Sequence, residues 1–582
     1  MKLKTNSPKK INIALFIISL VLITAIMFVC IGQKEGFHED EIYSYGSANN
    51  KYTDIFYASG ERDATNRTIN EHIIEDTFGA TMDNVSYYLN HFDEFNTLAN
   101  ANLDAERPVW KTAQEAQDYL IVSEDERFNF ISPYYHQARD VHPPVFYYLV
   151  HIVSSVFAGV FSKYIIFGIN MVFFLLTCLI IRKILILYDR EHLVVPVVLL
   201  YGLSMGAVSM VIFLRMYSVL TFFTIAYFYL TLKIVKDDFH ISKRIAALLI
   251  LTTVAGFLTQ YYFCLFIVPV FIVVCAYLLK TKKFKNALWY TVYHIISAVA
   301  GVLLFPPSIY HIFFSYRGFG NPNQVVFWDQ FEAIINRVLY AFSINRFIGV
   351  GIFLIILSYI FVRIISKTDA PEKKRSMLFN IALFVVPVIV FLMITAKLSP
   401  NLDVKTMVRY ITPVLPVMAI CFIVFAEKVI NLLGLTNLKK RTIAVYALVA
   451  VMTVSGFVTS KPSYLYSGYD RYVEIAEEHK DLNYVYVYDN YFTHLNSLPE
   501  MMVYNKTLMV NFYDEKQLNV LSGNEELENS DKFVLSIKKW MINDQNPDEV
   551  LNKVLELTGY TKAEILLNEN DDTQSIIYLI TK

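Results

Sequence analysis

Long apolar runs recur along most of this chain and are separated by short polar stretches. Each run is close to the length of roughly 20 residues that a helix needs to cross the hydrocarbon core of a bilayer. The pattern therefore predicts a mainly α, polytopic membrane protein of about eleven transmembrane helices. The predicted spans are 11–31, 163–181, 193–213, 216–232, 245–259, 261–279, 287–305, 347–362, 377–395, 411–426 and 442–459.

The run at 143–161 is long enough to span, but its polar residues fall at helical spacing on one stripe. Loop charge separates the two alternatives, because Lys and Arg are enriched in cytoplasmic loops. If this run lies flat on the outer interface, the basic loops between the later spans all fall inside, whereas a spanning run would place them all outside. We therefore predict an interfacial helix. The stripe comprises His151, Ser154, Ser155 and Ser162, and the basic loops are 182–183, 233–244, 280–285, 363–375 and 428–441.

The first apolar run is predicted to enter from the cytoplasm, because the four lysines Lys2, Lys4, Lys9 and Lys10 precede it. No small-residue cleavage site follows the run, so we predict an uncleaved anchor. Two large regions then lie outside the cell, the acidic first loop at 33–142 and the tail at 461–582. We expect a short interfacial helix at 83–100 in the first loop.

The tail differs in pattern from the transmembrane domain at 1–460. Residues 483–488 and 532–537 have the β-branched and aromatic content of strands, and 547–559 have the capping residues of a helix that ends at a glycine. We therefore predict a small extracellular α/β domain.

Composition agrees with a multi-pass protein of the plasma membrane, since 55% of the 582 residues are hydrophobic, 18% are charged, and the mean hydropathy is +0.41. The bilayer is therefore an expected partner, whereas the net charge of -1 says little about any other partner. All five cysteines fall in apolar stretches without ligand-like spacing, which argues against a disulfide framework or a zinc site. We find no Gly-rich nucleotide loop and no basic, aromatic patch for nucleic acid.

The predicted threading brings polar residues from distant parts of the sequence to the outer membrane face. A carboxylate pair, cations and aromatic rings would suit a site that joins a hydroxyl to a sugar leaving a lipid phosphate. Taken singly, each feature has a structural explanation, since acidic loops are solvated, arginines snorkel and tyrosines form interfacial belts. The candidate site residues are Asp40, Glu41, His142, Arg215, Tyr217, Gln260, Tyr261, Arg409 and Tyr410.

These motifs resemble the GT-C glycosyltransferases, in particular the family 39-like enzymes related to protein O-mannosyltransferases and the aminoarabinose transferase of lipid A. The resemblance covers about residues 11–460 and implies a GT-C-like fold. It also implies transfer of a sugar from a polyprenyl-phosphate-linked donor, outside the cytoplasm, to an acceptor hydroxyl on a protein, wall polymer or lipid. The motifs are Asp40-Glu41, His142-Pro143-Pro144, Arg215-Met216-Tyr217, Gln260-Tyr261-Tyr262 and Arg409-Tyr410.

By this resemblance Asp40 is the expected catalytic base and the reaction inverts the anomeric carbon. No general acid is expected, because a phosphate ester leaves without protonation. Glu41 is expected to orient Asp40 or to hold a divalent cation with it, although two carboxylates with His38 or His142 form an incomplete metal shell. Arg215 and Arg409 are expected to compensate phosphate charge, and the remaining candidates to bind substrate.

Two other functions fit the number of spans. A transporter or lipid flippase would place ionisable groups near the bilayer midplane, whereas these spans carry few, His294 being an exception. A polysaccharide polymerase or ligase would be expected to place its major outer loop late in the chain. Here the large loop follows the first span.

Overall fold

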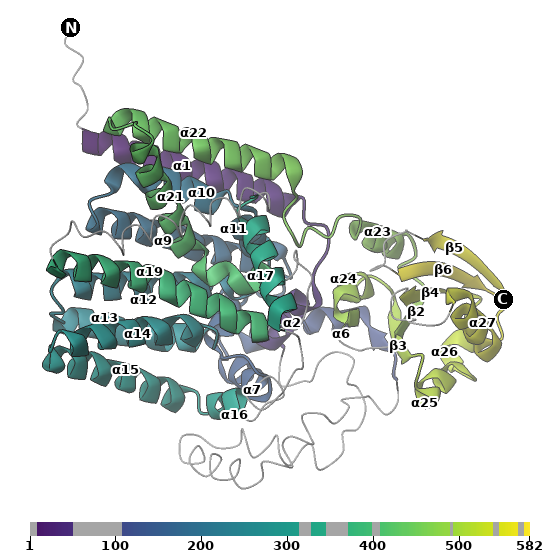
Figure 1. The fold of residues 1–582 in the computed structure, drawn as a ribbon. Helices are drawn as coiled ribbons and strands as arrows, with labels where there is room; N and C mark the ends of the chain where they lie inside the picture. The colour runs from purple at the N-terminus through teal and green to yellow at the C-terminus, as the bar shows by residue number, and fades with distance from the viewer. Residues whose placement is uncertain are drawn as a thin grey trace.

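The computed structural model describes residues 8–50, 108–313, 327–344, 371–398, 408–488, 493–538, 546–568 and 575–582. The predicted helix at 83–100 and the predicted span at 347–362 lie outside these residues. A bundle of long helices carries an α/β domain at one of its ends (Figure 1). The mainly α, polytopic class is confirmed.

Eight of the described helices are long and apolar enough to cross a membrane. Many of their large apolar side chains are exposed, among them Val21, Leu303 and Val451, as expected for surfaces that face lipid. These spans are α1 (Pro8–Gly32), α9 (Lys163–Leu187), α12 (Tyr217–Lys236), α14 (Phe263–Lys280), α15 (Phe284–Leu304), α19 (Pro371–Leu398), α22 (Leu438–Thr459) and the pair η3 (Val408–Val414) and α21 (Leu415–Leu432).

The span predicted at 193–213 is a pair of helices, because the helix breaks inside the apolar run. Helices α10 (Val194–Gly202) and α11 (Met205–Ile212) belong to a pair bent by 60°. Ser204 lies at the break, where its hydroxyl accepts a hydrogen bond from the Ala207 amide at 3.2 Å and so caps the second helix. The span predicted at 245–259 coincides with α13 (Lys243–Phe257), whose 15 residues make it shorter than the eight helices that are long enough to cross a membrane.

Helix α8 (Val145–Val156) has 12 residues and is therefore about 18 Å long, too short for a hydrocarbon core of about 30 Å. Its length agrees with the prediction that this segment does not span. His151 and Ser154 of the predicted polar stripe are buried against α2 (Glu39–Asn49). They contact the Ala48 carbonyl at 2.8 Å and the Asn49 side-chain amide at 3.1 Å.

Several of the basic loops lie together, at the end of the bundle opposite the α/β domain (Figure 1). Arg190, in the loop after α9, and Arg441, in the first turn of α22, both pair with the buried Glu427 of α21, at 2.7 and 3.0 Å. Lys283 pairs with Asp238 and joins the loop after α14 to the loop after α12. This arrangement agrees with the predicted threading.

The α/β domain contains a six-stranded sheet in the order β1-β3-β2-β4-β6-β5. Strands β2, β3 and β4 are mutually parallel, and β5 and β6 are antiparallel additions. The strands predicted at 483–488 and 532–537 and the helix predicted at 547–559 are all present. The bounds are β2 (Asn483–Tyr488), β3 (Lys506–Asn511), β4 (Lys532–Lys538), α27 (Pro547–Thr558), β5 (Lys562–Leu567) and β6 (Ser575–Thr581).

One strand of this sheet comes from the segment between α1 and α8 and not from the tail. Strand β1 (Lys111–Thr112) pairs antiparallel with β3, where Lys111 lies opposite Thr507. The neighbouring Trp110 donates its indole N–H to the Asn524 side chain at 3.1 Å. The segment that carries β1 and the tail therefore share one sheet.

The two faces of the sheet pack on different cores. Tyr484, Tyr486 and Tyr488 of β2 belong to the same apolar core as the membrane helices. Val485 and Val487 alternate with them and belong to a separate core beneath α27. The tyrosine face thus fixes the domain against the bundle.

Short helices complete the described structure. They are α6 (Ala113–Asp118), η1 (Glu124–Glu126), α7 (Ile131–Arg139), η2 (Glu191–Leu193), α16 (Ser308–Phe313), α17 (Phe327–Ala341), α23 (Asp470–Glu478), η4 (Thr493–Ser497), α24 (Leu498–Met501), α25 (Glu515–Leu518), η5 (Asn519–Leu521) and α26 (Glu525–Glu528).

Candidate functional site

The acidic motif forms the first turn of α2, directly after the linker that leaves α1. His38 is the N-cap residue, and its Nδ1 accepts a hydrogen bond from the Asp40 amide at 3.0 Å. Burial, together with the nearby Arg409 and Arg215, lowers the pKa of His38 to about 3 although Asp40 opposes this shift. The ring is therefore neutral at physiological pH, with its proton on Nε2. The positive end of the helix dipole favours carboxylates in this turn.

Glu41 lies in a fully buried ion pair. Its carboxylate contacts Lys34 Nζ at 2.9 Å, and neither side chain is exposed to solvent. It also accepts hydrogen bonds from the amides of His38 at 2.7 Å and Leu214 at 2.8 Å. Burial raises the pKa of Glu41, whereas Lys34 and the two amides favour the charged form. These contacts suit a residue that positions the start of α2, next to Arg215.

Asp40 is the accessible carboxylate of the pair. Its side chain is 31% exposed, and its Oδ2 contacts the Arg409 guanidinium at 2.9 Å. An opposite charge at this distance favours the ionised carboxylate, which is the form that a base requires. Arg409 itself is buried on η3 and lies over the rings of Phe213 and Tyr410, at 5.4 and 5.1 Å from the ring centroids.

Arg215 is the second buried cation of the site. One of its terminal nitrogens donates to the Asp40 carbonyl at 3.2 Å, to Ser44 Oγ at 2.8 Å and to Tyr147 Oη at 3.2 Å. The other lies 3.4 Å from His142 Nε2. Arg215 thus ties the acidic helix α2 to the start of α8.

His142 is oriented by its neighbour Asp140, whose carboxylate lies 2.6 Å from His142 Nδ1. Arginine can only donate, so the Nε2 that faces Arg215 carries the lone pair and Nδ1 carries the proton. The histidine therefore links a carboxylate to a guanidinium.

Aromatic rings line the side of the site formed by α12 and η3. Tyr217 meets Tyr410 edge to face with ring centroids 6.0 Å apart, and Tyr262 lies 5.6 Å from Tyr410. Phe213 stacks on Tyr464, from the segment after α22, at 4.0 Å. Phe213, Tyr217 and Tyr464 are buried, whereas Tyr262 and Tyr410 are only partly buried and offer aromatic surface of the kind that binds sugars.

Two candidates lie differently from the expectation. Tyr261 is directed to α16, where its hydroxyl contacts His311 Nδ1 at 2.9 Å, so it is Tyr262 that approaches Tyr410. Gln260 is buried in the turn between α13 and α14.

A divalent cation does not fit the two carboxylates as they are arranged. Asp40 already contacts Arg409, and Glu41 already contacts Lys34, so each negative charge has a cation beside it. Among the residues that the structure describes, no group of three or more His, Cys, Asp or Glu side chains is placed to hold a metal ion.

Four residues complete the site without having been predicted as members of it: Lys34, Asp140, Tyr147 and Phe213. Asp140 and Tyr147 flank His142 in the sequence, so the His-Pro-Pro motif could have indicated them. Lys34 gave no such signal, because a lysine just after a span is ordinarily an interfacial charge.

The arrangement combines a partly exposed carboxylate, two buried guanidinium groups and a group of aromatic rings. The Nε atoms of Arg215 and Arg409 are buried and have no hydrogen-bond partner among the described residues. Unpaired donors on cations suit an anion such as a phosphate ester.

No protein-family model matches the chain, and no curated protein matches it. A solved structure of ArnT from Cupriavidus metallidurans bound to undecaprenyl phosphate is similar to this chain at 11% identity and a TM-score of 0.46. The similarity covers 96% of this chain and 97% of that one. ArnT from the same organism in the apo state is similar at 12% identity and a TM-score of 0.45, over 85% of this chain and 98% of that one.

Proposed function

We propose that the protein is a membrane glycosyltransferase that moves a sugar from a polyprenyl-phosphate-linked donor to an acceptor hydroxyl outside the cytoplasm. The observation that carries this proposal is the meeting of Asp40 with two buried arginines, from elements far apart in the sequence, at one end of the bundle.

The chemical step needs a base and a place for negative charge. The acceptor hydroxyl oxygen forms a bond to the anomeric carbon while the bond from that carbon to the phosphate oxygen breaks. Asp40 takes the hydroxyl proton, and the polyprenyl phosphate leaves with the bonding electron pair. Attack opposite to the leaving group inverts the anomeric carbon.

Arg409 and Arg215 are placed to compensate the leaving phosphate. A terminal nitrogen of Arg409 donates to Asp40 Oδ2, and a terminal nitrogen of Arg215 donates to the Asp40 carbonyl. The Nε–H group of each arginine has no hydrogen-bond partner among the described residues. A guanidinium can hold the base with one nitrogen and a phosphate oxygen with another. The cations would therefore link the base to the leaving group.

The polar groups inside the spans give less support to a transporter. His294 of α15 is bonded to the Tyr290 carbonyl at 2.7 Å and to the Tyr227 hydroxyl at 2.8 Å, so both of its ring nitrogens are engaged within the bundle. Translocation sites usually place such groups on a cavity.

Replacement of Asp40 by Asn tests the proposal, because the change keeps the volume of the side chain and removes the base. With purified protein in lipid nanodiscs, release of labelled sugar from a panel of polyprenyl-phosphate sugars should fall by about 10²–10⁴-fold. Glu39→Gln is the matched control, since this neighbouring carboxylate is also 31% exposed and should leave turnover close to wild type. Near-normal turnover by Asp40→Asn, or no use of any such donor by the wild type, would contradict the proposal.

A further inference from the structure

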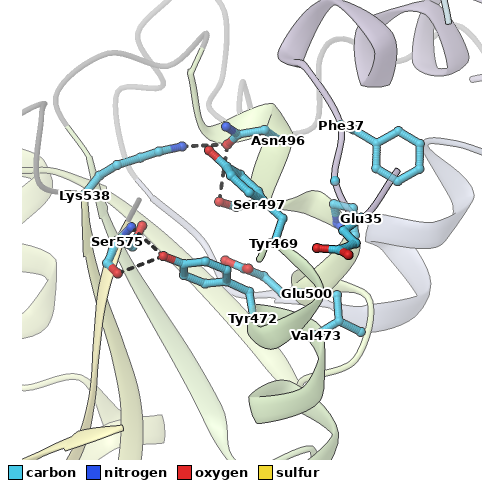
Figure 2. Close-up of a pocket in the computed structure, with 12 residues that line it drawn as sticks. Glu35, Phe37, Tyr469, Tyr472, Val473, Asn496, Ser497, Glu500, Lys538 and Ser575 are labelled. Atoms are coloured by element: carbon cyan, nitrogen blue, oxygen red, sulfur yellow. Dashed lines mark hydrogen bonds between the residues drawn. The ribbon is translucent and has the colours of Figure 1, made fainter. Parts of the chain in front are cut away.

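A pocket lies between the linker that leads to α2 and the α/β domain (Figure 2). The cavity volume is about 110 Å³. The lining residues are Glu35, Gly36, Phe37, Tyr469, Tyr472, Val473, Asn496, Ser497, Pro499, Glu500, Lys538 and Ser575.

The pocket is found where sheet topology favours ligand binding. It lies at the carboxyl ends of the adjacent parallel strands β2 and β4, where Lys538 ends β4 and Asn496 follows β2. The chain leaves β2 toward β3 on one side and leaves β4 toward β5 and β6 on the other. A crevice at such a reversal of strand order is the usual ligand site of parallel sheets.

The polar groups of the pocket are held in fixed positions. Lys538 is 2% exposed, and its Nζ donates to Asn496 Oδ1 at 2.6 Å (Figure 2). Buried Glu500 accepts a hydrogen bond from Tyr484 Oη at 2.7 Å. Tyr472 exchanges hydrogen bonds with the Ser575 backbone, each at 3.0 Å, and so fixes α23 to β6.

Aromatic rings connect this pocket to the candidate active site. His38, which caps α2 beside Asp40, lies 6.4 Å from Tyr466, and Tyr466 lies 5.3 Å from Tyr469 in the pocket wall. Burial and Asp40 raise the pKa of Glu39 to about 7, and Lys538 opposes this rise, so the pocket lysine acts on the first turn of α2.

We propose that this pocket binds a sugar residue of the acceptor, so that the acceptor is a neutral or amino-bearing glycan. The lining contains two carboxyl groups, of Glu35 and Glu500, and a single ammonium group, of Lys538, and this balance disfavours an anionic ligand. Fixed amide, hydroxyl and carboxyl groups beside the Tyr469 ring are the groups that bind sugar hydroxyls and a sugar face. The assignment rests on the proposed transferase function, since a second sugar held here would present its neighbour to Asp40.

Direct binding tests the pocket independently of turnover. Wild-type protein in nanodiscs should bind a neutral glucotetraose or a deacetylated chitotetraose more tightly than tetragalacturonate, as measured by calorimetry. Tyr469→Ala should weaken that binding by about 10-fold, whereas Tyr469→Phe should retain most of it. Tyr513→Ala is the control, because that tyrosine of the same domain is 54% exposed and lies outside the pocket lining.

The kinetic test uses the same variants with labelled donor and tetrasaccharide acceptor. Tyr469→Ala, or Asn496→Ala if the first variant does not fold, should raise the KM for acceptor more than it lowers kcat. Tighter binding of tetragalacturonate, binding of a hydrophilic peptide in place of the glycans, or no loss of glycan affinity in Tyr469→Ala would overturn the proposal. So would the absence of glycan binding up to about 10 mM. If glycans bind as expected but no polyprenyl-phosphate sugar is consumed, the pocket stands as a glycan site and the transferase function fails.

Discussion

The buried ion pair between Lys34 and Glu41 gives the most quantitative prediction. In Lys34→Met the carboxylate loses its counterion in a place where neither side chain is exposed. Removing one partner of a buried pair costs about 3–5 kcal/mol of folding stability. Two backbone amides still donate to Glu41, so we expect about 3 kcal/mol, near the lower end.

The same contacts predict how a second substitution acts. Glu41→Gln removes the stranded charge and keeps an acceptor oxygen, so the double variant Lys34→Met/Glu41→Gln should be more stable than Lys34→Met alone. The deficit of Lys34→Met should also grow with pH. Without Lys34 the pKa of Glu41 in the folded state is raised further. The folded protein then holds the Glu41 proton more tightly than the unfolded chain does, so the free energy of unfolding falls as pH rises.

Unfolding in detergent can be followed with a fluorogenic thiol reagent, because Cys30 and Cys178 are buried in the folded protein. Lys163→Met is the matched control, since this nearby lysine donates only to backbone carbonyl groups, at 2.5 Å from the Lys34 carbonyl. A wild-type unfolding curve for Lys34→Met, or a double variant less stable than the single one, would refute the reasoning.

Three further predictions concern the cations, the N-cap and the threading. Arg409→Ala should lower kcat/KM for the donor by about 10–100-fold. Arg409→Lys should lower it by less, since lysine keeps the positive charge but cannot form the two parallel hydrogen bonds of a guanidinium. Wild-type kcat/KM in both variants would mean that Arg409 is an interface anchor and that other groups, such as Lys397, bind the phosphate. Because the pKa of His38 is lowered to about 3, the wild type should lose stability as pH falls below about 6.5. His38→Asn keeps the cap and should reduce that loss in thermal unfolding at pH 7.5 and 5.5, without abolishing it, because the pKa of buried His311 is also lowered, to about 4. Cysteine labelling of intact cells should reach Glu478→Cys and not Lys282→Cys, and labelling of both would contradict the threading.

The membrane part of the fold could be predicted because a bilayer sets the length of an apolar run. The break between α10 and α11 could not, since hydropathy continues through Gly202 and Ser204 and only the cap of Ser204 marks it. Strand β1 was equally hidden, because two residues carry no alternation of polar and apolar positions.

The candidate site was predictable to the extent that loop charge fixed the threading. That threading placed Asp40, Arg215 and Arg409 together. In the structure Arg215 donates a hydrogen bond to the Asp40 carbonyl and Arg409 donates one to the Asp40 carboxylate. The separate roles of the carboxylates were not predictable, since only packing shows that Glu41 is enclosed by Lys34 while Asp40 is accessible.

The pairing of β1 with the tail has a consequence for the biogenesis of the protein. Trp110 is made 414 residues before its partner Asn524. At about 5–20 residues per second, synthesis of that interval takes roughly 20–80 s, during which the early strand is already made but has no sheet to join. Strand β1 must therefore wait, through the synthesis of all later spans, for the strand that it joins, which makes it a natural substrate for chaperones and proteases during that interval.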